Sequence, residues 1–421
     1  MDRLVIEGSG RLEGSIRIHG AKNAVLPILA ATVLNGGENV IHNCPELSDV
    51  DASAEILRYL GCEVRRDADT LTVNSAAVTR CDIPEELMRE MRSSVIFLGA
   101  IIARFARADA ALPGGCELGP RPIDLHLKAF RQLGIDVYEE HGYIKCSTGK
   151  IVPASIDLDF PSVGATENIM LASVLAEGTT VITNAAREPE IEDLQDFLNT
   201  MGARVHGAGT SVIRIDGVKR LGRAEHRVIP DRIAAATYMA CGAASGGTVE
   251  LTDTQPRHME AFLSAAEQYG AKLYISEGRI VQVVPERLTA IKTVRTQPHP
   301  GFPTDAQAPL MAAMSVADGT SVFIENIFES RYKHVYELCR MGADITVDGR
   351  DAIVRGVKKL SGANVTAMDL RGGAALAVAA AAAEGITEIS GMEHVDRGYE
   401  KFDENLRRIG LRAQRVSGRS M

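Results

Sequence analysis

Hydrophobic and polar positions repeat along this chain in six successive blocks. Each block combines a nearly all-apolar stretch, a Gly-led stretch with the alternation of a strand, and an amphipathic helix-like stretch. The amphipathic stretch then ends in an apolar residue, a glycine and a second strand-like stretch. These glycines are Gly61, Gly134, Gly202, Gly270, Gly342 and Gly410, and successive ones lie 73, 68, 68, 72 and 68 residues apart. Because this period is too long for a solenoid, the pattern predicts six copies of one α/β unit.

The apolar stretches predict helices that are buried on every side, because a helix without a polar face has no side to offer to water. They run over 24–34, 168–176, 309–317 and 374–383. Strands are predicted at 178–182 and 319–323, and an amphipathic helix at 191–201. A chain of 421 residues allows two or three domains, and six units divide most simply into two domains of three. We therefore expect α/β domains with buried helices inside and sheets with amphipathic helices outside.

Charge and cysteine content narrow the range of partners. The net charge of −9 argues against nonspecific binding to nucleic acid or to anionic membranes, both of which need cationic surface. The seven cysteines form no CxxC pair, so reduced thiols are a better interpretation than a disulfide framework or a zinc site. The first residues do not read as a signal peptide, and the longest purely apolar run, 374–383, is too short to span a bilayer. We expect a soluble cytoplasmic protein with small-molecule partners.

Several predicted buried helices begin with a cation: Lys22, Arg92, Arg232 and Arg371. Ordinary N-capping explains Ser162 and Asp231, and extends to Thr304. It does not explain the cations, because a positive charge in the first helical turn opposes the helix dipole and needs a compensating anion. If the helix starts gather on one face of each domain, they form a site suited to phosphate and carboxylate ligands.

One loop, residues 111–126, departs from the repeat. It places Cys116 among three glycines and close to Arg121, with prolines on both sides. A thiol in such a loop can serve as a nucleophile or a proton donor, and an arginine beside it can adjust its pKa and hold an anion. The alternative is an idle surface thiol.

Seven motifs, in order along the chain, resemble those of the enolpyruvyl transferase family that acts on UDP-N-acetylglucosamine. They are 21–23, 112–125, 160–168, 230–233, 302–305, 369–371 and 396–399. The resemblance implies two inside-out α/β barrel domains, 22–229 and 230–421 plus 1–21, with the active site in the cleft between them. It implies transfer of the enolpyruvyl group of phosphoenolpyruvate to the sugar 3-hydroxyl, the first committed step of peptidoglycan synthesis. No metal and no organic cofactor is implied, and the oligomeric state is left open.

The resemblance also assigns roles to residues. The positions that match catalytic residues are Cys116, Asp305, Lys22, Arg397 and Asp369, with Cys116 as the acid and Asp305 as the base. Those that match substrate-binding positions are Lys22, Asn23, Arg92, Arg121, Pro122, Ile123, Asp124, Leu125, Ser162, Val163, Gly164, Asp305, Ile327, Arg331, Arg371 and Arg397.

Bland interpretations remain for some of these positions. Asp305 and Asp369 suit helix caps, Asp396 with Arg397 suits a surface ion pair, and Ile327 suits the core. The chain also departs from the family pattern at Ala234, Ala236 and Gly372. Two other functions therefore stay open: a catalytically silent UDP-sugar-binding paralogue, and enolpyruvyl transfer to shikimate 3-phosphate, against which the Pro-Gly-Gly-Cys loop argues.

Overall fold

The computed structural model describes residues 2–8, 10–91, 93–111 and 123–417. These residues form two compact units. One, unit 1, comprises the described parts of 1–19 and 230–421, and the other, unit 2, comprises the described parts of 20–229. Each unit has its own hydrophobic core.

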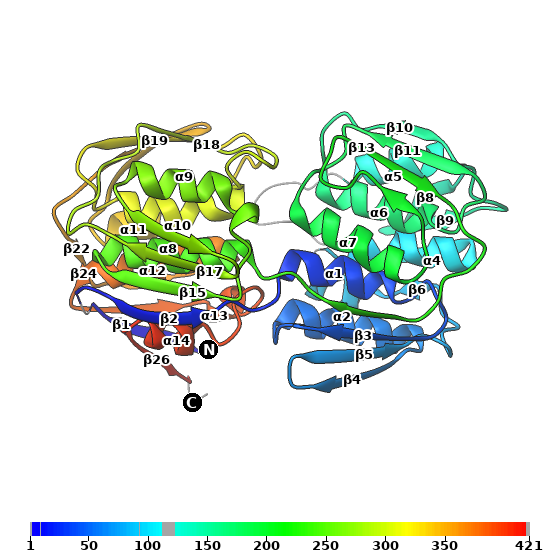
Figure 1. Ribbon diagram of the computed structural model, residues 1–421, viewed down its shortest axis with the longest axis horizontal. Coiled ribbons are helices and arrows are strands. Elements are labelled where there is room, and N and C mark those ends of the chain that lie inside the picture. Colours follow the sequence, from blue (N-terminus) through cyan, green and yellow to red (C-terminus); the bar gives the residue numbers. More distant parts are fainter. Residues whose placement is uncertain (1, 9, 92, 112–122, 418–421) are drawn as a thin grey trace. The chain divides into compact units, whose positions relative to one another are not determined.

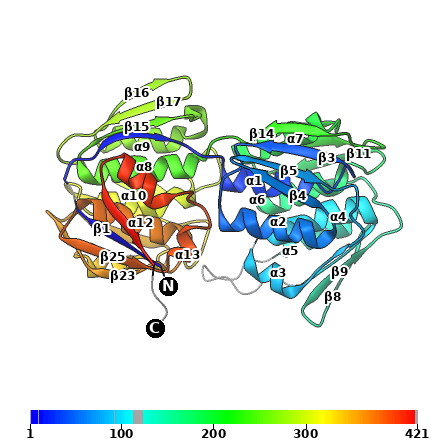
Figure 2. The same ribbon diagram turned by 90° about the horizontal axis from the view of Figure 1, so that it is seen from below.

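Each unit contains three buried helices at its centre, with sheets around them (Figures 1 and 2). The buried helices of unit 2 are α1 (Lys22–Ala31), α4 (Phe97–Phe105) and α6 (Val163–Ser173). Those of unit 1 are α8 (Arg232–Ser245), α10 (Thr304–Met314) and α12 (Leu370–Ala382). In α12, ten successive residues, 372–381, are buried, which is why its sequence carries no polar face. The predicted central helices are confirmed, with their starts displaced toward the N-terminus.

Amphipathic helices lie beside the sheets, one in each repeat. They are α2 (Ser48–Leu60), α5 (Asp124–Gln132), α7 (Pro189–Thr200), α9 (Glu260–Gln268), α11 (Val335–Arg340) and α14 (Phe402–Arg408). Shorter helical segments are α3 (Glu85–Glu90), η1 (Ser94–Ile96), η2 (Pro256–His258) and α13 (Met392–Val395). All six repeat glycines have positive φ, between 72° and 108°, as expected where a helix turns into a strand.

The described residues form six four-stranded sheets of one topology, plus a two-stranded ladder of β22 (Leu360–Ser361) and β24 (Ala383–Glu384). In each of the six, an edge strand pairs in parallel with the second strand, and the remaining pairings are antiparallel. The fold class predicted from the sequence is therefore confirmed.

Unit 2 holds three of these sheets. Their strand orders are β14 (Ala224–Arg227), β3 (Glu38–His42), β5 (Thr70–Asn74), β4 (Glu63–Asp67); β6 (Asp82–Ile83), β7 (Arg107–Ala111), β9 (Tyr143–Ser147), β8 (Asp136–Glu140); and β10 (Ser155–Asp157), β11 (Thr179–Thr183), β13 (Val212–Asp216), β12 (Val205–His206).

Unit 1 holds the other three. Their orders are β2 (Glu13–Arg17), β15 (Thr248–Thr252), β17 (Arg279–Val283), β16 (Lys272–Ser276); β18 (Thr293–Arg295), β19 (Thr320–Ile324), β21 (Asp351–Arg355), β20 (Asp344–Asp348); and β23 (Asn364–Thr366), β25 (Ile386–Ser390), β1 (Arg3–Glu7), β26 (Arg412–Val416).

Two edge strands belong to a different unit from the helix that follows them in the chain. Strand β2 precedes α1 of unit 2 but pairs with β15 of unit 1, and β14 precedes α8 of unit 1 but pairs with β3 of unit 2. The N-terminal strand β1 likewise completes the last sheet of unit 1.

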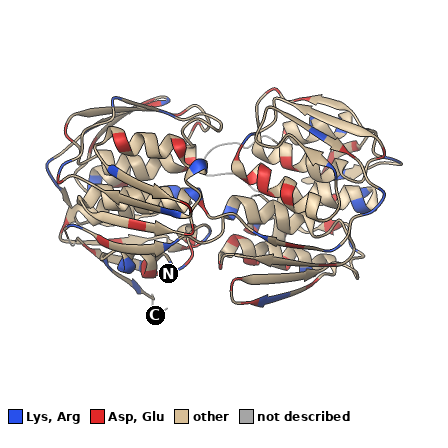
Figure 3. Ribbon diagram, viewed as in Figure 1, with Lys and Arg blue, Asp and Glu red and all other residues tan. Residues whose placement is uncertain are grey.

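Among the described residues no helix combines the length and apolar character needed to cross a membrane. Figure 3 shows acidic and basic residues interspersed along the ribbon of each unit.

Candidate active site

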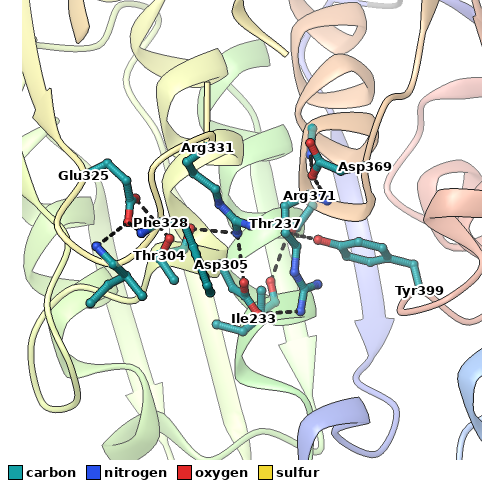
Figure 4. A network of polar contacts seen from close by, with 12 residues as sticks. Ile233, Thr237, Thr304, Asp305, Glu325, Phe328, Arg331, Asp369, Arg371 and Tyr399 are labelled. Carbon is teal, nitrogen blue, oxygen red and sulfur yellow. Dashed lines mark hydrogen bonds and ion pairs between the residues drawn. The ribbon is translucent and has the colours of Figure 1, made fainter. Parts of the chain in front are cut away.

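In unit 1, the carboxylate of Asp305 lies between two buried arginines (Figure 4). Asp305 is in the first turn of α10. Nη2 of Arg331 donates to Oδ1 at 2.8 Å, and Nη2 of Arg371 donates to Oδ2 at 3.1 Å. The two guanidinium side chains are 3% exposed, whereas the Asp305 side chain is 27% exposed. Each carboxylate oxygen therefore bonds to one arginine while the group keeps access to solvent.

Hydrogen bonds at the start of α10 position Arg331. Its Nη2 also donates to the carbonyl oxygen of Thr304 at 3.0 Å. The Thr304 hydroxyl in turn donates to Oε2 of Glu325 at 3.0 Å, and Oε1 of Glu325 accepts the backbone N–H groups of Ile327 and Phe328. The interpretation of Thr304 as a helix cap is wrong: α10 begins at Thr304, its N-cap is Pro303, and the hydroxyl binds the loop after β19 instead.

Arg371 lies in the first turn of α12, and Asp369, the residue before this helix, is its N-cap. Oδ1 of Asp369 accepts the backbone N–H groups of Arg371 at 3.0 Å and Gly372 at 2.9 Å. Its Oδ2 is buried and has no hydrogen-bonding partner among the described residues. The capping interpretation of Asp369 is thus confirmed, and one carboxylate oxygen remains for another group.

The charge of Arg371 is stabilised inside the unit. Its guanidinium lies 5.3 Å from the ring centroid of Tyr399, whose hydroxyl is 2.8 Å from the hydroxyl of Thr237 on α8. Burial opposes the charged form, but Asp305 and Tyr399 more than offset burial, so the pKa of Arg371 is raised above its ordinary value. The starts of α8, α10 and α12 therefore meet around one permanently charged group (Figure 4).

His334 is a buried neighbour of this cluster that the sequence analysis missed. It is 2% exposed, and neither ring nitrogen has a hydrogen-bonding partner among the described residues. Burial lowers the pKa of His334 to about 4, and the nearby Asp369 carboxylate opposes that shift. A Cβ atom at Gly372 would lie 3.0 Å from both Oδ2 of Asp369 and Cβ of His334. The departure from the family pattern at Gly372 thus leaves space between these two side chains.

In unit 2, Lys22 begins α1 and is neutralised by Asp49. The Nζ–Oδ2 distance is 2.7 Å, and the side chains are 12% and 2% exposed. Lys22 and Arg371 each have the carboxylate partner that a cation in a first helical turn requires. Asp49 lies in the first turn of α2, and no feature of the sequence indicated it. Asn23 is half-buried beside Lys22.

The predicted nucleotide-binding segments of unit 2 lie close together. Ser162 is the N-cap of α6, where its hydroxyl accepts the N–H of Ala165 at 3.3 Å, and Val163 and Gly164 follow in the first turn. His126, in the first turns of α5 just after Asp124 and Leu125, lies against Gly164. The starts of α5 and α6 are therefore neighbours, and Ile123 immediately precedes α5.

The remaining predicted residues have mixed positions. Arg397 and Ile327 are half-buried, so Ile327 is not a core residue. The carboxylate of Asp396 accepts two hydrogen bonds from Nη2 of Arg415, at 2.7 and 2.8 Å. Asp231 caps α8 by accepting from the N–H groups of Ile233 and Ala234, as predicted. The residues that lie outside the described part of the chain are Arg92, Cys116, Arg121 and Pro122.

Comparison with known proteins places this geometry in a family. Residues 6–406 match the family model described as EPSP synthase (3-phosphoshikimate 1-carboxyvinyltransferase). The chain is 49% identical over 416 residues to UDP-N-acetylglucosamine 1-carboxyvinyltransferase 2 of Caldanaerobacter subterraneus subsp. tengcongensis, covering 99% of this chain and 100% of the relative. It is 48% identical over 421 residues to UDP-N-acetylglucosamine 1-carboxyvinyltransferase 1 of Symbiobacterium thermophilum, covering 99% and 95%.

Solved structures share the fold. The enolpyruvyl transferase NikO from Streptomyces tendae superposes with a TM-score of 0.89 at 22% identity, over 99% of both chains. EPSP synthase from Acinetobacter baumannii superposes with a TM-score of 0.74 at 19% identity, over 99% of this chain and 100% of that one. The family model and the close relatives, each matched over nearly the whole chain, show that this protein is a 1-carboxyvinyltransferase, a member of the enolpyruvyl transferase family in the group of the UDP-N-acetylglucosamine 1-carboxyvinyltransferases.

Proposed function

We propose that this protein transfers the enolpyruvyl group of phosphoenolpyruvate to the 3-hydroxyl of UDP-N-acetylglucosamine and releases phosphate, the first committed step of peptidoglycan synthesis. The observation that carries the proposal is the solvent-accessible carboxylate of Asp305 held by buried Arg331 and Arg371, in a chain close to half identical to relatives named for this activity. Both substrates are cytoplasmic metabolites, so the proposal places the protein in the cytoplasm.

Asp305 is proposed as the base. The Asp305 carboxylate accepts a hydrogen bond from one arginine on each oxygen and is 27% exposed. It would accept the proton of the sugar hydroxyl as the hydroxyl oxygen attacks C2 of phosphoenolpyruvate. The arginines also fix the plane of the carboxylate, which supports a defined direction for proton transfer.

Cys116 is proposed as the acid. As the C2–O bond forms, the double bond of phosphoenolpyruvate takes a proton from the thiol at C3. The intermediate then loses phosphate from C2 and a proton from C3, which restores the double bond in the product. The thiolate left by the first proton transfer takes up the C3 proton, and the protonated Asp305 gives its proton to the departing phosphate, so both groups return to their starting states and no oxidant or reductant is needed.

The cations are proposed to hold the two anionic groups of phosphoenolpyruvate. Lys22, Arg121 and Arg397 would bind its phosphate and carboxylate, supported by Arg92, Arg331 and Arg371. Lys22 and Arg371 have protein carboxylates as partners, so each can be presented in a fixed direction. We further propose that the unit holding Lys22 and Cys116 and the unit holding Asp305 form one active site in a cleft between them.

The sugar nucleotide is proposed to bind at the starts of α5 and α6. The segments 123–125 and 162–164 would contact it, together with Asn23, Arg121 and Pro122, and Ile327 would contact it from unit 1. Asp369, whose Oδ2 has no hydrogen-bonding partner in the described part of the chain, is proposed to lie beside the reacting carbon.

Phosphate release from phosphoenolpyruvate, measured with each acceptor in turn, tests the proposal. Release that depends on UDP-N-acetylglucosamine is expected. Release with shikimate 3-phosphate instead would assign the sister reaction. Tight binding of the UDP-sugar without release would assign a silent UDP-sugar-binding protein.

A further inference from the structure

The side chain of Asn168 connects three helices next to the predicted nucleotide site. Asn168 lies on α6 and is fully buried. Its Oδ1 accepts the N–H of Gly99 on α4 at 2.8 Å. Its Nδ2 donates to the carbonyl oxygen of Val95 at 3.0 Å and contacts Nδ1 of His126 on α5 at 2.8 Å.

These contacts determine the protonation of the His126 ring. A backbone N–H can only donate and a backbone carbonyl can only accept, so Gly99 and Val95 fix which end of the Asn168 amide is oxygen. The amide nitrogen must then donate to Nδ1 of His126. Nδ1 therefore carries no hydrogen, and the ring proton lies on Nε2.

The neutral form is also the stable form. A proton on Nδ1 would face the N–H₂ group of Asn168, and burial lowers the pKa of His126 to about 4 although Asp124 opposes that shift. Because the Asn168 amide keeps Nδ1 as an acceptor, the neutral ring keeps its hydrogen on Nε2, which remains a donor.

The Nε2–H group faces the start of α6. A Cβ atom at position 164 would lie 3.3 Å from Nε2, so the glycine leaves this nitrogen uncovered. The His126 side chain is 7% exposed, and the described residues supply no acceptor for its Nε2, although this nitrogen is not sealed from solvent. The Nε2–H can therefore donate to an oxygen of a ligand or water that reaches it.

We propose that His126 binds an acceptor oxygen of the nucleotide part of the sugar nucleotide through Nε2–H, and that Asn168 is the positioning residue that fixes this tautomer. The inference rests on the proposed function for the identity of the ligand. It adds a neutral donor to the backbone N–H groups at the start of α6. Because the donor carries no charge, it recognises an oxygen by direction more than by net charge.

Calorimetric binding of UDP-N-acetylglucosamine and of UDP to the full-length protein tests the role of His126. His126→Phe keeps a planar ring without the donor and should weaken binding of both ligands about tenfold, the effect of one lost hydrogen bond to a buried group. His126→Gln, whose amide nitrogen reaches the position of Nε2, should stay within about threefold of wild type. Unchanged affinity in the Phe variant, or weakened binding of UDP-N-acetylglucosamine but not of UDP, would overturn the inference. Equal melting temperatures of the variants exclude loss through unfolding.

Nitrogen NMR of the labelled His126 ring tests the role of Asn168. In wild type, Nε2 should carry the proton and Nδ1 should not. In Asn168→Asp, a carboxylate oxygen replaces the amide nitrogen and should draw the proton to Nδ1. A wild-type ring protonated at Nδ1 would refute the tautomer. Neither measurement depends on turnover. If the protein binds UDP as expected but releases no phosphate, the proposed function is wrong and the inference about His126 still stands.

Discussion

Replacement of Asp305 by alanine separates its two proposed tasks, proton acceptance and neutralisation of charge. Asp305→Ala removes the only carboxylate that the described residues place between Arg331 and Arg371. Proton transfer by a positioned side chain contributes at least about 100-fold, so turnover should fall by that factor or more. Affinity for UDP-N-acetylglucosamine should stay within a few-fold, because the base acts mainly in the transition state.

The same change should destabilise unit 1. Removing one partner of a buried ion pair costs about 3–5 kcal/mol when the remaining charge is sealed from water. Both guanidinium groups are 3% exposed, but the Asp305 side chain is 27% exposed, so water can enter the space it leaves. We therefore expect a smaller loss than that, about 2–3 kcal/mol, which lowers the melting temperature of a unit of this size by about 5–10 °C.

Phosphate provides a second readout. Two guanidinium groups without a carboxylate form a site for an oxyanion. Inorganic phosphate should therefore raise the melting temperature of Asp305→Ala more than that of wild type. Asp403→Ala is the matched control, because it breaks the 2.8 Å pair with Arg407 elsewhere in the same unit and should change neither turnover nor the phosphate effect.

Three results would refute this reasoning. Turnover of Asp305→Ala within tenfold of wild type would remove Asp305 as the base. A melting temperature equal to that of wild type would show that the two arginines do not depend on this carboxylate. An identical phosphate effect in both proteins would show that they do not form an anion site.

Three further predictions concern other parts of the chain. Cys116→Ala should abolish phosphate release while Cys116→Asp keeps measurable activity, since an acid needs only a transferable proton; failure of the Asp variant would indicate an obligatory covalent adduct. Gly99→Ala should lower the free energy of unfolding, measured in urea, by about 1–3 kcal/mol, because the new Cβ would lie 2.5 Å from the carbonyl oxygen of Asn168. Gly222→Ala is the control and should change this free energy little, because the nearest atom to its Cβ would be 3.7 Å away. Similar losses in both variants would contradict the packing argument. Burial, with Glu190 and Glu188 nearby, raises the pKa of Glu167 well above 4.5, so above that pH the unfolded chain releases a proton that the folded protein keeps, and wild-type stability falls as pH rises. Glu167→Gln should flatten that fall between pH 5 and 8, and parallel stability profiles for both proteins would disprove it.

Local pattern predicted the elements and the class of fold. The all-apolar stretches became central helices, because a stretch without a polar side can only be stable inside. The six repeat glycines adopt positive φ, because the turn from helix to strand needs a conformation that other residues avoid. Capping by Ser162 and Asp231 was also predictable, because a capping side chain bonds to a backbone N–H only two or three residues away.

The site itself was predicted only in part. The residue types at the helix starts indicated anion binding, and the need for compensating charge was correct. The partners were not predictable: Asp305 meets Arg331 26 residues later and Arg371 66 residues later, at separations that no local rule encodes. The same holds for Asp49, for the Thr304–Glu325 contact and for Asp396, which binds Arg415.

The sequence by itself determined the repeat, the helix boundaries to within a few residues and the chemistry available at the helix starts, because these depend on periodicity and on backbone bonds within a few residues. Tertiary structure decided which strands close each unit and which charges pair. Strands β2 and β14 pair in the unit opposite to the helix that follows each of them. Strand edges and charged side chains form hydrogen bonds and ion pairs with the groups that packing brings within about 3 Å. Which groups come that close depends on the assembled unit and not on any single segment.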